Sequence, residues 1–159
     1  MDANANLNPK VGMEFDTLED AWEFWVKYGR QVGFDVRKHY INKITNIFWA
    51  DARMVIDYAN FGDVVTFDTT YGTHKKLRPL RVFTGFNHHR GLTIFGAALL
   101  YDEMVESFKW LFESFLVAYA SKRPKTIFTD QEPAMAKALS EVMPNTYHGL
   151  CTWHIMQMG

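Results

Sequence analysis

Cysteine is almost absent from this sequence of 159 residues, which contains one, Cys151. A single cysteine excludes an internal disulfide framework and is typical of a reducing compartment. It also excludes a zinc site built from several cysteines of this sequence. No apolar run reaches the ~20 residues that a membrane-spanning helix needs. Residues 1–10 have no apolar segment that resembles a secretory signal, so we expect a disordered leader there and no membrane partner.

Acidic residues are missing between Asp68 and Asp102, although the net charge of the whole chain is only −1. The basic residues of this acid-free stretch are Lys75, Lys76, Arg78, Arg81 and Arg90. A segregated basic segment is typical of a surface that meets phosphates, so we expect these side chains to contact nucleic acid. A basic loop without a partner fits the same composition.

Hydrophobic residues make up 48% of the chain, so it can bury a core, and its length suits one domain, with or without a short appendage. In the first half, Thr17 can cap a helix that ends before Gly33, and residues 34–36 alternate like a strand. The pattern then breaks at residues 43–46, which we interpret as a domain boundary. Residues 51–59 again have helical spacing.

From residue 64 onward the patterns of strands and helices alternate. They predict strands at 64–67, 80–86, 92–101, 126–129 and 147–150, helices at 103–121 and 132–143, and the start of another helix at 151–158. A meander of three strands followed by crossover helices gives a mixed sheet with flanking helices. We therefore expect an α/β fold, and the order of elements matches the ribonuclease H-like architecture.

Two aspartates follow two of these predicted strands. Asp68 comes after Val-Val-Thr-Phe, and Asp130 comes after Thr-Ile-Phe-Thr. Carboxylates at the ends of adjacent strands can converge on one point, where they can hold Mg²⁺ for phosphoryl transfer on DNA. The alternative is that each aspartate only caps a helix or stabilises a turn. A catalytic site would also need a third carboxylate, and neither Glu132 nor Glu141 is well placed to supply it.

Cys151 and His154 form a C-x-x-H motif, whose thiolate and imidazole have a spacing that suits one zinc ion. The motif supplies only half of a zinc site. The alternative is a buried thiol close to a histidine that faces solvent.

Several short motifs between residues 44 and 158 resemble one known family. They are Phe48-Trp49-Ala50-Asp51, Gly62-Asp63-Val64-Val65-Thr66-Phe67-Asp68, Asn87-His88-His89, Thr129-Asp130-Gln131 and Leu150-Cys151-Thr152-Trp153-His154. Together they resemble the transposase domain of the plant far-red impaired response / far-red elongated hypocotyl family. Members of that family are domesticated Mutator-like transposases that act as nuclear transcription regulators.

The resemblance implies roles for four residues. It places the first two acids of the transposase triad on Asp68 and Asp130, and the family's C-x-x-H element on Cys151 and His154. The third acid, a glutamate, and a further zinc-binding module would lie beyond Gly159. The resemblance also implies a nuclear protein that binds DNA, together with other regulators or a family homologue as a dimer partner.

Residues 11–43 resemble the start of the family's N-terminal DNA-binding domain, which leads into a WRKY-like zinc finger. No cysteine precedes Cys151, so the zinc ligands of that finger are missing. We therefore expect residues 1–10 as a leader and 11–43 as a short helical remnant without zinc ligands. Residues 44–159 are expected as a ribonuclease H-like transposase domain that is incomplete at its C-terminus.

Three functional interpretations follow from these observations. The first is a DNA-associated transcription regulator without catalysis, since the third acid is absent from the chain. The second is a metal-dependent transposase that uses Asp68 and Asp130. The third is a non-functional fragment of either.

Overall fold

The computed structural model describes residues 16–40, 44–70 and 80–151. Its elements follow in the order α1 (Leu18–Val32), β1 (Phe34–Tyr40), β2 (Ile44–Asp51), α2 (Ala52–Phe61), β3 (Val64–Thr70), β4 (Leu80–Phe86), β5 (Leu92–Leu99), α3 (Val105–Ala118), β6 (Thr126–Thr129), α4 (Pro133–Val142) and β7 (Tyr147–Leu150). The fold is therefore mixed α/β, as the alternating patterns predicted. Within the described ranges, no helix is long and apolar enough to cross a membrane.

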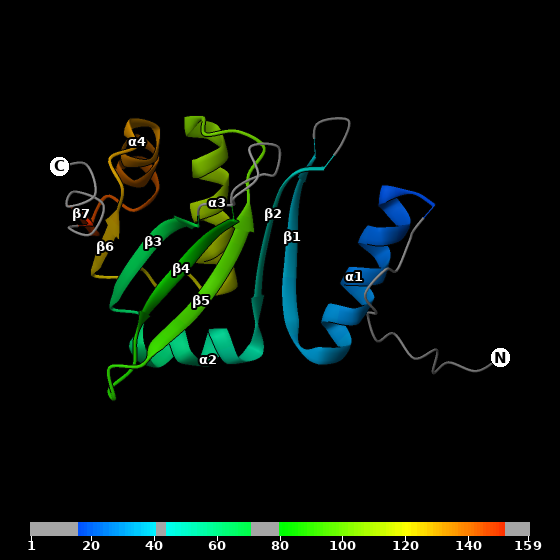
Figure 1. Cartoon of the computed structure of the whole chain (residues 1–159), viewed down its shortest axis with the longest axis horizontal. Coiled ribbons are helices and arrows are strands. Elements are labelled where there is room, and N and C mark those ends of the chain that lie inside the picture. Colours follow the sequence, from blue (N-terminus) through cyan, green and yellow to red (C-terminus); the bar gives the residue numbers. More distant parts are fainter. Residues whose placement is uncertain (1–15, 41–43, 71–79, 152–159) are drawn as a thin grey trace.

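The strands form one mixed sheet in the order β1-β2-β5-β4-β3-β6-β7 (Figure 1). The pairs β1-β2, β2-β5, β5-β4 and β4-β3 are antiparallel. The pairs β3-β6 and β6-β7 are parallel. Helices α3 and α4 follow β5 and β6, so each connects two strands that run in the same direction, as crossover connections require. The predicted meander of three strands is confirmed as β3-β4-β5.

The core lies between the sheet and helices α2, α3 and α4. Phe67 and Phe83 project from neighbouring strands and are fully buried, and Phe83 stacks on Phe115 of α3 with ring centroids 4.3 Å apart. Tyr58 of α2 packs edge-to-face on Phe95 and Phe115. The aromatic residues of the predicted stripe on α3 therefore serve packing, and we call this side of the sheet the helix-covered face.

Helix α1 packs against the opposite side of the sheet at β1 and β2. The ammonium of Lys38 lies 4.5 Å from the ring centroid of Trp22, and Lys38 is paired with Ile47 across the two strands. Side chains alternate along a strand, so Lys38 and Ile47 point away from the side that buries Phe48. Among the described helices, α1 alone lies on this second side, at its β1–β2 end, and we call this side the open face.

The predicted helix starts are explained by side-chain caps. The Thr17 hydroxyl accepts a hydrogen bond from the Asp20 amide at 3.0 Å, and α1 ends at Gly33, whose φ of 83° suits glycine. Asp51 caps α2 by accepting a bond from the Met54 amide at 2.7 Å. Local sequence therefore sets where these two helices begin.

Replacing Asp51 by alanine should lower the free energy of unfolding by about 1 kcal/mol, because the cap of α2 is lost. Asp57→Ala on the same helix is a matched control, since its ion pair with the exposed Arg53 spans 3.8 Å and contributes little. Urea denaturation of both variants measures the difference. Equal losses would show that the cap of α2 does not matter.

The sequence predictions of boundaries and element ends compare with the structure as follows in the first half of the chain and at its two ends. Strand β2 begins at Ile44, within the break predicted at residues 43–46, and pairs with β1 from Phe34↔Asp51 to Tyr40↔Ile44. The strand after Gly62 extends to Thr70, so Asp68 lies inside β3 rather than beyond its end. The division into residues 11–43 and 44–159 stays a prediction, with the sheet continuous across it. The helix predicted at 151–158 falls almost wholly outside the described residues, as does the leader.

Candidate metal-binding and nucleic-acid site

Strand topology places Asp68 and Asp130 at the same end of neighbouring strands. Strands β3 and β6 are parallel neighbours, with Val64 opposite Thr126 and Thr66 opposite Phe128. Asp68 lies two residues beyond Thr66 on β3, and Asp130 lies two residues beyond Phe128, directly after β6 ends at Thr129. Both aspartates therefore lie at the edge where β3, β5, β6 and β7 end.

The Asp68 carboxylate lies on the open face of the sheet. Asp68 alternates with the buried Phe67, so its side chain points away from α3. Both aspartates are half-buried, and in each the Oδ1 atom is inaccessible to solvent. Carboxylate oxygens at the ends of two neighbouring strands are hard ligands of the kind that Mg²⁺ prefers.

A hydrogen-bonded chain holds the backbone at Asp130. The hydroxyl of the buried Thr129 donates to the Asp130 carbonyl at 2.8 Å, and it lies 2.7 Å from His148 Nε2. The hydroxyl has one proton, so His148 Nε2 must be the donor in the second bond. The Cys151 amide also donates to the Thr129 carbonyl at 2.7 Å. Sequence reasoning missed Thr129 and His148, because a contact across 19 residues leaves no local pattern.

Burial lowers the pKa of His148 below its usual value near 6.5. The unfolded chain therefore binds more protons than the folded chain just below pH 6.5, and the free energy of unfolding falls on acidification. We expect the melting temperature to decrease between pH 7 and pH 5.5, less steeply in His148→Gln. Thermal melts of both proteins at the two pH values measure this, and identical slopes would contradict it.

The acidic residues of α4 have other partners. Glu132 caps the helix, with Oε1 accepting a bond from the Ala134 amide at 3.2 Å. Glu141 pairs with Lys109 at 3.1 Å. In the ranges that the structure describes, no three His, Cys, Asp or Glu side chains gather in a group that could hold a metal ion. Glu132 rather than Asp130 caps α4, so the alternative of a helix cap does not account for Asp130.

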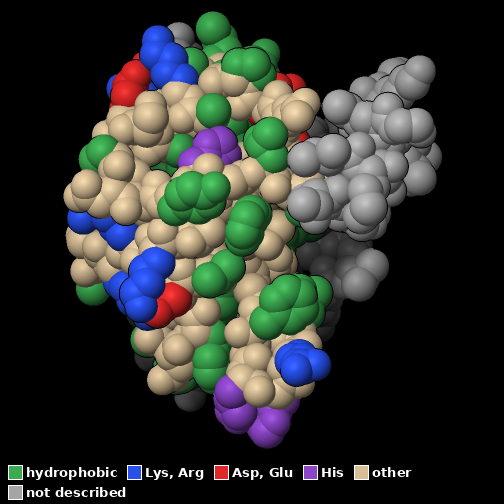
Figure 2. All heavy atoms as spheres, turned by 90° about the vertical axis from the view of Figure 1, so that its left-hand side faces the viewer, with side chains coloured by type: hydrophobic (Ala, Val, Ile, Leu, Met, Phe, Trp, Pro, Cys, Tyr) green, Lys and Arg blue, Asp and Glu red, His purple; other side chains and the backbone are tan. Residues whose placement is uncertain are grey.

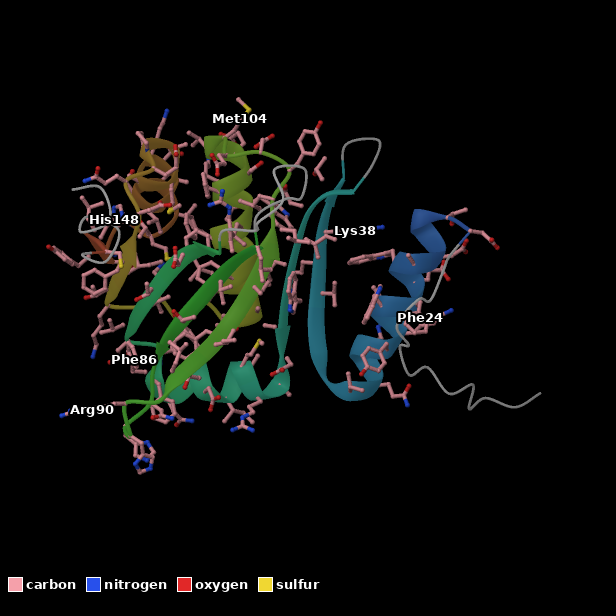
Figure 3. The ribbon with its side chains drawn as sticks, in the orientation of Figure 1. Phe24, Lys38, Phe86, Arg90, Met104 and His148 are labelled. Carbon is pink, nitrogen blue, oxygen red and sulfur yellow. The ribbon has the colours of Figure 1, made fainter. Side chains whose placement is uncertain are left out.

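The basic residues of the acid-free stretch have different environments. Arg81 is only 2% exposed, its guanidinium pairs with Glu103 at 2.5 Å, and it lies over the ring of Phe108. We therefore assign Arg81 a structural role in place of the predicted contact with phosphate. Arg90 is exposed at the tip of the β4–β5 hairpin, at the other end of the sheet from Asp130 (Figure 3). Lys75, Lys76 and Arg78 lie outside the described residues.

The predicted zinc half-site is only partly described. Cys151 is a half-buried free thiol at the end of β7, whereas His154 lies outside the described residues. The zinc ligation of this pair therefore stays a prediction.

An exposed apolar row crosses the open face at the end far from the aspartates. The register of β5, β4 and β3 aligns Leu92, Phe86 and Val64, with exposed fractions of 66%, 63% and 50%. Tyr147 of β7 continues the row beyond Thr126. Hydrophobic side chains are visible at the surface on the β7 side of the molecule (Figure 2).

The chain is similar in sequence to one family of known proteins. The MULE transposase domain family matches residues 64–158, which include both aspartates. The chain is 44% identical over 115 residues to Protein FAR-RED IMPAIRED RESPONSE 1 of Arabidopsis thaliana, a match that covers 72% of this chain and 14% of that protein. It is 42% identical over 113 residues to Protein FAR1-RELATED SEQUENCE 4 of the same plant, covering 71% of this chain and 15% of that protein. The chain thus spans about one seventh of the length of these relatives.

Proposed function

Since the chain belongs to the MULE transposase domain family, we propose that it is the DNA-associating, ribonuclease H-like part of a nuclear transcription regulator derived from a transposase. The strand order supports the fold assignment. An antiparallel β5-β4-β3 meander is extended by β6 and β7 in the parallel direction, each reached through a helix. The likeness to FAR-RED IMPAIRED RESPONSE 1 and its relatives supports the regulatory role and the nuclear location.

The observation that supports the proposal is the position of Asp68 and Asp130 at the same end of the neighbouring parallel strands β3 and β6. Their hard carboxylate oxygens fit Mg²⁺, which is commonly held by one or two carboxylates together with water and phosphate oxygens. A bound Mg²⁺ would supply positive charge to the phosphates of DNA. Asp68 and Asp130 would hold the ion, while Thr129 and His148 keep the backbone of Asp130 in place.

Lys75, Lys76, Arg78 and Arg90 supply the remaining contacts to phosphate in this proposal. Arg81 is excluded because its side chain is buried. Zinc at Cys151 and His154, and a second regulator or a family homologue as dimer partner, belong to the same proposal and rest on the family resemblance.

DNA affinity should fall as the salt concentration rises. In a plot of log Kd against the logarithm of the salt concentration, each phosphate neutralised should add roughly 0.9 to the slope. Changing Lys75, Lys76 and Arg78 to serine should reduce that slope by about 3. A matched control changes Lys27, Arg123 and Lys137, which are exposed on three other parts of the surface. Fluorescence anisotropy with a 20-base-pair duplex at several salt concentrations measures the slopes. Equal slopes for both triple variants would overturn the basic segment as the DNA contact.

A second candidate function is metal-dependent cleavage of DNA, favoured by the same pair of aspartates. It predicts nicking of supercoiled DNA in Mg²⁺ or Mn²⁺ that is lost in Asp68→Asn. DNA binding without nicking would support the regulator, whereas nicking that Asp68→Asn abolishes would support the transposase.

A further inference from the structure

A groove with a volume of about 900 Å³ lies at the edge of the sheet where β2 begins and β5 ends. Its walls come from the start of β2, the loop between β5 and α3, the first three turns of α3, and the start of α4. Helix α3 lies on the helix-covered face, so the groove is distinct from the site of Asp68, which points to the open face. The groove has no part in the proposed contacts to DNA.

Hydrogen bonds hold the floor of the groove in one arrangement. Asn46 is 1% exposed, and its Oδ1 accepts a bond from the Tyr101 amide at 2.9 Å. Its Nδ2 donates to Ser107 Oγ at 3.4 Å, and Ser107 donates to Asp102 Oδ1 at 2.7 Å. The Met104 amide donates to the same oxygen at 3.1 Å. The groove is therefore preformed, and its occupant need not order it.

The rim of the groove is apolar. Met104 is 66% exposed and Tyr101 is 51% exposed, while Val105 and Trp110 contribute half-buried surface below them. Met104 stands at the outer end of α3 (Figure 3). A flexible methionine beside aromatic rings is a surface that adapts to the side chain of a partner.

The charge in the groove is negative. Asp102, Glu106 and Glu113 line it, and Lys109 is its one lysine or arginine among the described lining residues. Lys109 lies 3.1 Å from Glu141 and 3.7 Å from Glu106. The hydrogen bond to Glu141 is the main cause that raises the pKa of Lys109, so Glu141, which is not a lining residue of the groove, balances the charge of this lysine. An occupant with positive charge therefore complements the groove, whereas a phosphate would be repelled.

We propose that this groove binds a segment of a partner protein in which large apolar side chains are flanked by lysine or arginine. The apolar side chains contact Tyr101, Met104 and Trp110, and the basic groups meet Glu106 and Glu113. The chain is thereby an adaptor that binds DNA on one surface and a basic, apolar protein segment on another.

The test uses three fluorescent peptides of 14 residues, in which the apolar and charged positions follow the same helical spacing. The first combines leucine with lysine, the second replaces lysine by glutamate, and the third replaces leucine by serine. We expect the leucine–lysine peptide to bind and each of the others to bind at least about tenfold more weakly. Equal binding of the leucine–lysine and leucine–glutamate peptides would overturn the proposal.

Variants of the protein locate the binding. Glu106→Lys with Glu113→Lys should weaken the leucine–lysine peptide about tenfold, because two charge pairs become repulsive. Glu23→Lys with Asp57→Lys makes the same change of net charge away from the groove and should leave most of the affinity intact. Equal weakening by both pairs would show non-specific attraction and overturn the proposal.

A separate variant covers the case in which reversal of two charges unfolds α3. Met104→Gln changes an exposed side chain, should keep the melting temperature, and should weaken the peptide several-fold by removing apolar contact. If the peptide binds Met104→Gln and the unchanged chain equally, the groove is not its site. If sedimentation instead shows a dimer that Met104→Gln dissociates, the occupant is a second copy of the chain and the proposal is wrong.

Discussion

Replacing Phe83 by alanine should lower the free energy of unfolding by about 3–5 kcal/mol, which is the range for a large buried aromatic residue. Phe83 is fully buried at the centre of β4. Its ring centroid lies 4.5 Å from that of Phe67 and 4.3 Å from that of Phe115. The sheet and α3 meet through these rings, so the cavity left by alanine cannot close without moving both layers.

Phe86→Ala is the matched control for this substitution, because Phe86 lies on the same strand and is 63% exposed. Its loss should change the free energy of unfolding by no more than about 0.5 kcal/mol. Guanidinium denaturation of both variants measures the two changes in the free energy of unfolding, and we expect the dependence on denaturant concentration to have the same slope in both. A loss at Phe86 as large as that at Phe83 would mean that the open face is covered in solution.

Replacing Asp68 by asparagine should lower the affinity for Mg²⁺ at least about tenfold, since one of two charged ligands is removed. Asp130→Asn should have an effect of the same size, because the two carboxylates occupy equivalent positions on neighbouring strands. The loss of Mg²⁺ affinity in the double variant should be smaller than the sum of the two single losses, because both residues act on one ion. Isothermal titration with Mg²⁺ measures all three.

Asp63→Asn is the control for the aspartate variants. Asp63 is exposed and its Oδ2 atom lies 2.7 Å from Lys125 Nζ, a pair that lowers the pKa of Asp63 mainly through the hydrogen bond. Losing this carboxylate should leave Mg²⁺ affinity unchanged. If Asp63→Asn weakens Mg²⁺ as much as Asp68→Asn, the ion is bound by diffuse charge and not by the pair.

The parts of the fold that could be predicted depend on neighbours in sequence. The caps at Thr17 and Asp51 lie three residues from the amides that they bind. The position of Asp68 and Asp130 at the same end of two parallel strands could also be predicted, because each follows a β-rich run and a crossover helix makes the two strands parallel. Asp68 and Asp130 each lie two residues beyond the paired residues Thr66 and Phe128.

The parts that could not be predicted depend on contacts between distant residues. The pattern of apolar residues breaks at residues 43–46 and gives no sign of the start of β2, where Asn46 is buried and bonded to Tyr101, 55 residues away. Arg81 looked like a phosphate contact because its stretch contains no acid. Its partner Glu103 lies just beyond that stretch, and only the fold shows that the arginine is buried.

The central claim is that Asp68 and Asp130 form one divalent-cation site on the open face. Mn²⁺ added in small amounts to isotope-labelled protein tests it most directly, because the ion broadens the NMR signals of nearby residues. We expect the amide signals of residues 67–69 and 129–131 to broaden together, while those of His88 and Arg90 at the far end of the sheet stay sharp. The same experiment on Asp68→Asn should show little broadening. Broadening centred elsewhere, or unchanged in Asp68→Asn, would contradict the account.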